Sequence, residues 1–119
     1  MKYLLLIYES EAARAAVPET ERGKIFQEYV DYSKRIRKNG NYIGGEALQP
    51  TSTATTVRVK NGKTLTTDGP FAETREQLGG FFFVEAKDLD EAIKLAAEIP
   101  GARTGSIEVR PILPTPPVE

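Results

Sequence analysis

The stretch Phe81-Phe82-Phe83-Val84-Glu85-Ala86-Lys87-Asp88-Leu89-Asp90-Glu91-Ala92 decides the fold of this 119-residue chain. Its first half, Phe81–Ala86, is an apolar run of strand length that ends in polar residues. Asp88 then stands at a helix N-cap position, and Glu91 three residues later completes a capping-box pattern. The helix is expected to end at Pro100-Gly101, with an inner stripe of Leu89, Ala92, Ile93, Ala96 and Ala97. A buried strand that leads directly into a helix predicts a β-α unit.

A second strand–helix series lies earlier in the chain. Tyr3–Tyr8 is a short apolar run that predicts a strand. Gly40 is expected to stop a helix that begins near Pro18 and ends near Lys38. Helical spacing along it places apolar or small residues at Ile25, Phe26, Tyr29, Val30, Ser33 and Ile36. Tyr42–Leu48 predicts the next strand, and its Gly44-Gly45 pair indicates a bulge or a close backbone approach.

The insertion between the two series is a β-hairpin. Asn61-Gly62 is the strongest short hairpin signal, and Thr53–Lys60 and Lys63–Asp68 flank it. With a last strand at Ser106–Ile112, the order is β-α-β-hairpin-β-α-β, which without the hairpin is the split βαβ pattern. We therefore predict an α+β, ferredoxin-like fold, in which an antiparallel sheet carries two helices on one face and the hairpin is an insertion.

The chain length suits a single domain, expected at residues 1–112 and followed by a proline-rich tail at 113–119. A compact protein of this 13.1 kDa mass exposes roughly 6,400 Å² when folded and about 19,000 Å² when unfolded. We therefore expect about two thirds of the surface to be buried on folding.

The composition excludes several classes of site. Cysteine and histidine are both absent, which excludes disulfides, thiolate zinc sites, cysteine nucleophiles and Ser-His-Asp triads. No cofactor and no metal site is expected. A net charge of −1 gives no electrostatic reason to bind nucleic acid or an anionic membrane. The apolar run at Tyr3–Tyr8 is too short for a membrane helix or a signal sequence, so we expect a cytoplasmic protein.

Both faces of the central strands are apolar. Alternation groups Tyr3, Leu5, Ile7, Phe81 and Phe83 as one set of side chains, and Leu4, Leu6, Tyr8, Phe82 and Val84 as the other. A sheet with one wet face should instead alternate apolar with polar residues. We therefore predict a homodimer joined through the sheet faces. In the alternative, the hairpin and the tail of a monomer fold over the second face.

The segment that follows the hairpin, Asp68–Gly80, is the densest run of polar and special-backbone residues. An Asx turn at Asp68 would need the N–H of Pro70, which proline lacks. Asp68 is therefore either a turn-organising carboxylate or a site carboxylate. A two-residue loop places Thr55 opposite Asp68 and turns Arg58 to the other face. This makes Arg75, Arg110 or an arginine of a second subunit the better partner. The candidate ligand-binding residues are Tyr8, Asp68, Gly69, Pro70, Phe71, Glu73, Arg75 and Arg110.

At Asp68-Gly69-Pro70-Phe71 the sequence resembles the YCII-related family, specifically its DGPF branch. The similarity extends nearly from end to end, through Met1–Tyr8, Gly44–Pro50, Asp68–Phe83, Asp88–Ala92 and Gly105–Pro111. It implies a ferredoxin-like fold and a dimer of the dimeric α+β barrel type. It also implies a suspected enzymatic activity that depends on a His–Asp pair. The aspartate of that pair corresponds to Asp68, whereas its histidine has no counterpart in this chain.

Three functional hypotheses follow. The first is a dimeric small-molecule-binding or transcription-linked accessory module, favoured because no nucleophile–base pair is identifiable. The second is an enzyme in which Asp68 acts as the acid or base without a histidine, which requires an apolar, closed pocket. The third is a partner protein of an extracytoplasmic-function sigma factor, because the resemblance implies an association with such factors.

Overall fold

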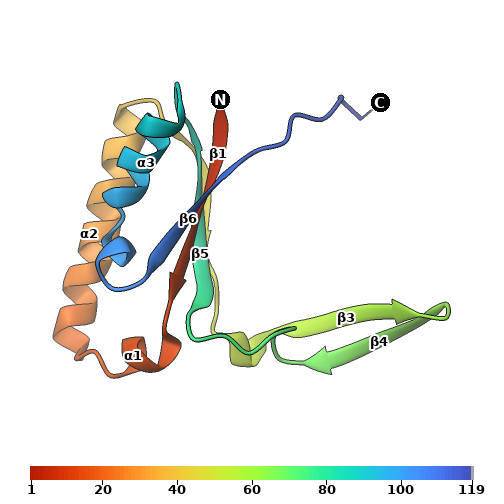
Figure 1. Ribbon diagram of the computed structural model, residues 1–119. Coiled ribbons are helices and arrows are strands. Elements are labelled where there is room, and N and C mark those ends of the chain that lie inside the picture. Colours follow the sequence, from red (N-terminus) through yellow and green to blue (C-terminus); the bar gives the residue numbers. More distant parts are fainter. Residues whose placement is uncertain (119) are drawn as a thin grey trace.

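A computed structural model describes residues 1–118 as two layers, a four-stranded antiparallel sheet and the helices packed on one of its faces (Figure 1). The sheet has the strand order β2-β5-β1-β6, so β1 and β5 are central. This confirms the predicted α+β architecture. The elements are β1 (Lys2–Glu9), α1 (Glu11–Ala15), α2 (Glu19–Lys38), β2 (Tyr42–Ala47), η1 (Thr51–Thr53), β3 (Thr55–Lys60), β4 (Lys63–Asp68), β5 (Gln77–Glu85), α3 (Leu89–Ala97), η2 (Pro100–Arg103) and β6 (Ser106–Pro111).

The core lies between the sheet and the helices. Tyr32 illustrates its packing: it is 1% exposed, its ring meets Phe82 edge-on, and its hydroxyl donates to the Leu95 carbonyl at 2.7 Å. Burial of this phenol raises its pKa well above the ordinary tyrosine value. The buried apolar residues are Tyr3, Leu5, Ile7, Tyr32, Ile36, Val84, Ala86, Ala92, Leu95, Ala96 and Ile99.

The predicted grouping of the central side chains is wrong. The register pairs Leu4 with Phe83 and Leu5 with Phe82, so Phe82 and Val84 share the helix-covered face with Tyr3, Leu5 and Ile7. The other face carries Leu4, Leu6, Tyr8, Phe81 and Phe83. Alternation within one strand shows which of its side chains share a face. Which face of a neighbouring strand lies on the same side of the sheet depends on the pairing register, and a shift of one residue moves every side chain of that strand to the other face.

The helix stripes also differ in detail. The buried residues of α3 are Ala92, Leu95 and Ala96, whereas the predicted Leu89 and Ile93 are each 50% exposed and Ala97 is exposed. In α2, Phe26 is 68% exposed. Small Ala92 and Ala96 let α3 approach the sheet closely, which turns the larger Leu89 and Ile93 outward. The N-cap at Asp88 is confirmed, since its carboxylate accepts from the Glu91 N–H at 2.9 Å, but Glu91 accepts from the N–H of Lys87, one residue before the N-cap, at 3.0 Å.

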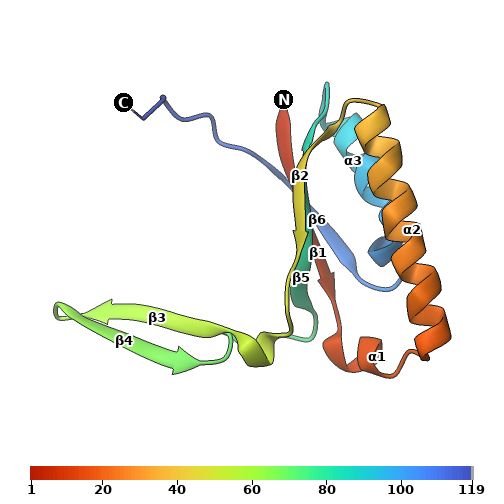
Figure 2. The same cartoon turned by 180° about the vertical axis from the view of Figure 1, so that it is seen from behind.

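The hairpin, here called the arm (residues 55–68), forms as predicted. Asn61 and Gly62 have φ angles of 52° and 77°, which suits a two-residue turn of type I′. The register places Thr55 opposite Asp68 and Arg58 opposite Leu65. Figures 1 and 2 show the arm leaving one end of the sheet and extending away from the body, on the side opposite the helices. The second face of the sheet is therefore not covered by the chain's own hairpin.

The shape exposes more surface than expected. The accessible area is 8861 Å², about 2,500 Å² above the value for a compact monomer of this mass. The radius of gyration is 16.5 Å, against about 13.5 Å for a compact domain of this length. The expectation that two thirds of the surface is buried is therefore wrong for a single chain, because the arm and the extended residues after β6 project from the body (Figure 1).

Two smaller features are relevant to the site. The sequence patterns did not predict α1, although Ser10 caps it by accepting from the Ala13 N–H at 3.1 Å. The predicted close approach at Gly45 is confirmed, because a Cβ there would lie 2.9 Å from the Phe81 carbonyl oxygen. No helix within residues 1–118 combines the length and the apolar character needed to cross a bilayer.

Candidate functional site

The Asp68–Phe71 segment lies at the base of the arm, where the chain turns back toward the sheet. Gly69 has a φ of +98°, a conformation that favours glycine. Its N–H donates to the Ala54 carbonyl at 2.7 Å, and its carbonyl accepts from the Thr56 hydroxyl at 2.8 Å. The motif therefore closes the base of the arm through its backbone, which leaves the side chains of Asp68 and Phe71 outside this network.

Asp68 is exposed and is the last residue of β4. Within residues 1–118 none of the ion pairs includes Asp68. Arg58 lies on the opposite face of the arm, in agreement with the hairpin register. Arg110 instead donates to Glu108 of its own strand through both Nε and Nη2. A single chain therefore presents an exposed carboxylate that has no cationic partner in its own described part.

A cavity of about 200 Å³ opens beside this segment. It brings together Gly69, Pro70 and Glu73 of the predicted site, and it leaves out Asp68, Phe71 and Arg75. The surface that lines it is more apolar than polar, although hydroxyl, amide and carboxylate side chains also contribute. The full lining consists of Thr51, Ser52, Gly69, Pro70, Ala72, Glu73, Thr74 and Gln77.

The cavity wall is tied to the body by Glu11. The Thr51 N–H donates to one carboxylate oxygen of Glu11 at 2.8 Å, and the Thr51 hydroxyl donates to the other at 2.6 Å. These hydrogen bonds from Thr51 lower the pKa of Glu11. The N–H of Glu11 donates to Gln77 at 2.9 Å, so α1 holds both ends of the segment that carries the arm. The sequence analysis did not predict this link. The available signal was Ser10, a residue type that favours a helix N-cap and that caps α1 in the structure.

The two remaining predicted residues, Tyr8 and Arg110, lie on the open sheet face. Tyr8 is half-buried and pairs with Ser106, while Arg110 is exposed and pairs with Leu4. They share that face with the partly exposed apolar residues Leu4, Leu6, Phe81 and Phe83. The structure thus divides the predicted site residues between the sheet face and the base of the arm.

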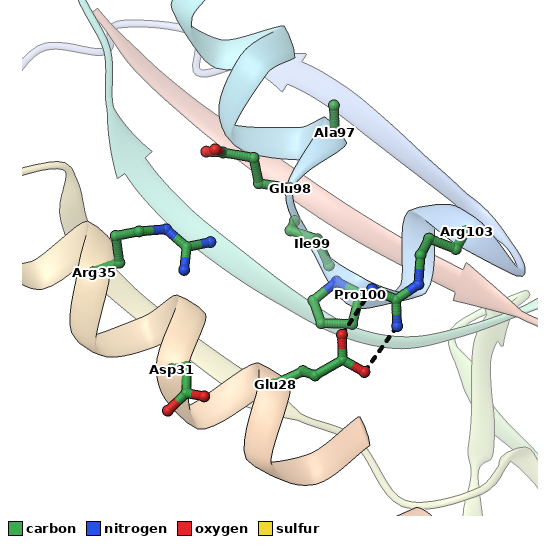
Figure 3. A pocket seen from close by; sticks show the side chains of 8 residues that line it. All are labelled: Glu28, Asp31, Arg35, Ala97, Glu98, Ile99, Pro100 and Arg103. Carbon is green, nitrogen blue, oxygen red and sulfur yellow. Dashed lines mark hydrogen bonds and ion pairs between the residues drawn. The ribbon is translucent and has the colours of Figure 1, made fainter. Parts of the chain in front are cut away.

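A second cavity, of about 390 Å³, lies in the helix layer between α2 and the α3–η2 segment (Figure 3). Arg103 closes one end through a two-point contact with Glu28, at 2.7 and 2.8 Å. This hydrogen bonding lowers the pKa of the Glu28 carboxyl. Figure 3 shows Arg35 reaching from α2 toward this space, and Glu98 lines it from the other wall. No sequence pattern indicated this cavity.

Tyr29 occupies the junction between α2, β1 and η2. Its hydroxyl accepts from the Gly101 N–H at 3.1 Å and donates to Glu9 at 3.4 Å. Burial, with the nearby Glu9 charge, raises the pKa of Tyr29 to about 12. The phenol therefore stays protonated at neutral pH and acts as a structural donor. Within residues 1–118 no three acidic side chains gather in a way that could hold a metal ion.

Comparisons with known proteins cover nearly the whole chain. The model of the YCII-related domain matches residues 1–116. An uncharacterised protein of Rhizobium meliloti (strain 1021) is 36% identical over 114 residues, which cover 94% of this chain and 92% of that protein. The name of that relative assigns no reaction, so the similarity establishes the family and gives no substrate. The chain belongs to the family of YCII-related domain proteins.

Proposed function

We propose that this YCII-related protein, of the DGPF branch, is a cytoplasmic homodimer that binds a small molecule where the two sheet faces meet. The observation that carries the proposal is the open sheet face. It is lined by Leu4, Leu6, Phe81 and Phe83, and Figures 1 and 2 show that, within residues 1–118, neither the helices nor the arm covers it. A cytoplasmic location agrees with a chain that has no cysteine to oxidise.

The exposed area supports a second copy as the cover. A standard protein interface removes about 800 Å² from each partner. The surplus of about 2,500 Å² over a compact monomer exceeds that amount, and because the arm and the residues after β6 account for it, these segments have surface to bury against a second copy. Apolar side chains on both faces of β1 and β5 favour burial on both sides.

The polar groups at the edge of this face define the ligand chemistry. Asp68 offers a carboxylate that forms no ion pair within residues 1–118, and Tyr8 and Arg110 offer donors on the sheet. Such a set fits a small polar molecule that carries at least one hydrogen-bond donor. The absence of histidine favours binding over acid–base catalysis, so an enzyme that relies on Asp68 ranks second.

The dimer is tested by light scattering on a column eluate at micromolar protein concentration. The molar mass measured for the wild type should be twice the 13.1 kDa of one chain. Leu6→Lys, which places a charge on the open face, should give the monomer. Ile93→Lys is the matched control, because Ile93 is 50% exposed on the helix layer, and it should remain dimeric. A monomeric wild type, or a dimeric Leu6→Lys variant, would contradict the sheet-face dimer.

The same preparations test the ligand. A thermal-shift screen of metabolite classes should find a compound that raises the melting temperature of the wild type but not of Asp68→Asn. A protein that responds to no compound but gains stability on addition of an extracytoplasmic-function sigma factor would favour the partner-protein hypothesis instead.

A further inference from the structure

Within residues 1–118, the two strands of the arm pair with each other and with no strand of the main sheet. β3 and β4 pair with each other over six residues each, and they belong to a sheet separate from the main one. Val57 is 59% exposed and Val59 is 71% exposed. An isolated two-stranded hairpin is marginally stable in water at best. A protein that carries such an arm therefore benefits from a surface that covers it.

The register divides the arm into two unlike faces. One face carries only β-branched residues along its length, Thr55, Val57, Val59, Thr64 and Thr66, and it ends at Asp68. The opposite face carries Thr56, Arg58, Lys60, Lys63, Leu65 and Thr67. β-branched side chains suit a covered sheet surface, whereas three cations favour water or an acidic neighbour. The β-branched face is therefore the one suited to burial.

The direction of the arm favours a second copy of this chain as the occupant, and the charge distribution is compatible with attraction between copies. Three of the chain's 16 Lys and Arg residues lie on the arm, against one of its 17 Asp and Glu residues. The arm is thus cationic, and the remainder of the chain is acidic. The arm also leaves on the open side of the sheet (Figure 2), which is the side where the second copy lies in the proposed dimer. Twofold symmetry then forms the contact twice.

We propose that each arm lies with its β-branched face against the partner subunit, so that Asp68 of one copy becomes part of the other copy's sheet-face site. This inference rests on the proposed sheet-face dimer and makes that site composite. Asp68 lies on the face that is covered, and its carboxylate then takes its donor from the partner subunit. The exposed Phe71, 80% accessible in one chain, gains a covering surface by the same contact.

The test compares two lysine substitutions on opposite faces of the arm in the full chain. Val59→Lys should raise the dimer dissociation constant by about tenfold or more, because a charge enters the covered face. Leu65→Lys adds the same charge to the cationic face and should change the constant by less than about threefold. Sedimentation equilibrium measures both constants. Far-UV circular dichroism should show that the fold is retained, since both positions are exposed.

Hydrogen exchange of a peptide that covers residues 55–68 gives a second readout. Its amides should become protected as the wild-type concentration passes through the dissociation constant, and Val59→Lys should reduce that protection. A wild-type dimer whose constant is the same in both variants, with an arm that exchanges freely, overturns this inference and leaves the sheet-face dimer standing. A dimer that survives Leu6→Lys but is lost in Val59→Lys would be held by the arms alone, which overturns both the sheet-face dimer and the composite site.

Discussion

The body and the arm are two β structures built by different forces. In the body, β1 and β5 bury Leu5 and Val84 completely against the helices, so burial holds the strands in register. In the arm, β3 and β4 have no buried residue, and a two-residue turn sets their register. The comparison teaches that local turn chemistry can define a geometry without a core, while the stability of the molecule resides elsewhere.

The largest expected effect tests whether stability resides in the body. Leu5→Ala removes a side chain that is 0% exposed and should lower the free energy of unfolding by about 2–5 kcal/mol. Val57→Ala, the matched truncation in the arm, should change it by less than about 0.5 kcal/mol in dilute, monomeric protein. Urea denaturation followed by circular dichroism measures both. Equal losses in the two variants would mean that the arm is part of the cooperative unit.

A smaller effect tests whether the turn alone determines the strand register of the arm. Gly62 has a φ of +77°, so Gly62→Ala should destabilise the hairpin by about 1–2 kcal/mol through backbone strain. Amide exchange within residues 55–68 should accelerate, while the urea midpoint of the body stays unchanged. Gly23→Ala is the control of opposite sign, because a helical glycine with open space around it should stabilise the body by about 0.8–1 kcal/mol.

The smallest effect concerns the link between the two regions. Hydrogen bonds from Thr51 lower the pKa of Glu11 in the folded protein, so the carboxylate contributes stability above its unfolded pKa. That contribution is lost as the pH falls through the lower folded value. Glu11→Gln should therefore flatten the pH dependence of stability below about pH 5. Glu19→Gln, at the exposed first turn of α2, should leave it unchanged, as measured by thermal melts between pH 3 and pH 7. If Glu11→Gln leaves the pH dependence of stability unchanged, the hydrogen bonds from Thr51 do not depend on the negative charge of Glu11.

Much of the fold could be predicted because its signals are local. The Asn61-Gly62 turn, the N-cap at Asp88 and the stop at Gly40, whose φ is +80°, each depend on a few neighbouring residues. The grouping of Phe82 with Leu5 could not be predicted, because strand register is a property of two distant segments. The outward rotation of Leu89 likewise depends on how closely small residues let α3 approach the sheet.

For the candidate site, the sequence predicted the segment Asp68–Gly80 but not the contacts that its residues make. The arm register correctly turned Arg58 away from Asp68. The Glu11–Thr51 contact joins residues 40 positions apart, and no local pattern indicates such a pairing. The partner of Asp68 stays a prediction for the same reason, since it depends on surfaces brought together by assembly.

The placement of the tyrosines has a practical consequence for spectroscopy. All five tyrosines, at positions 3, 8, 29, 32 and 42, belong to the body, and the chain has no tryptophan. The arm contains no aromatic side chain at all. Intrinsic fluorescence and near-ultraviolet signals therefore arise in the body, and they respond to the arm only where it contacts an aromatic residue of the body. Because the chain is also free of cysteine, Asn61→Cys would give the arm a single thiol to which a fluorescent dye can be attached.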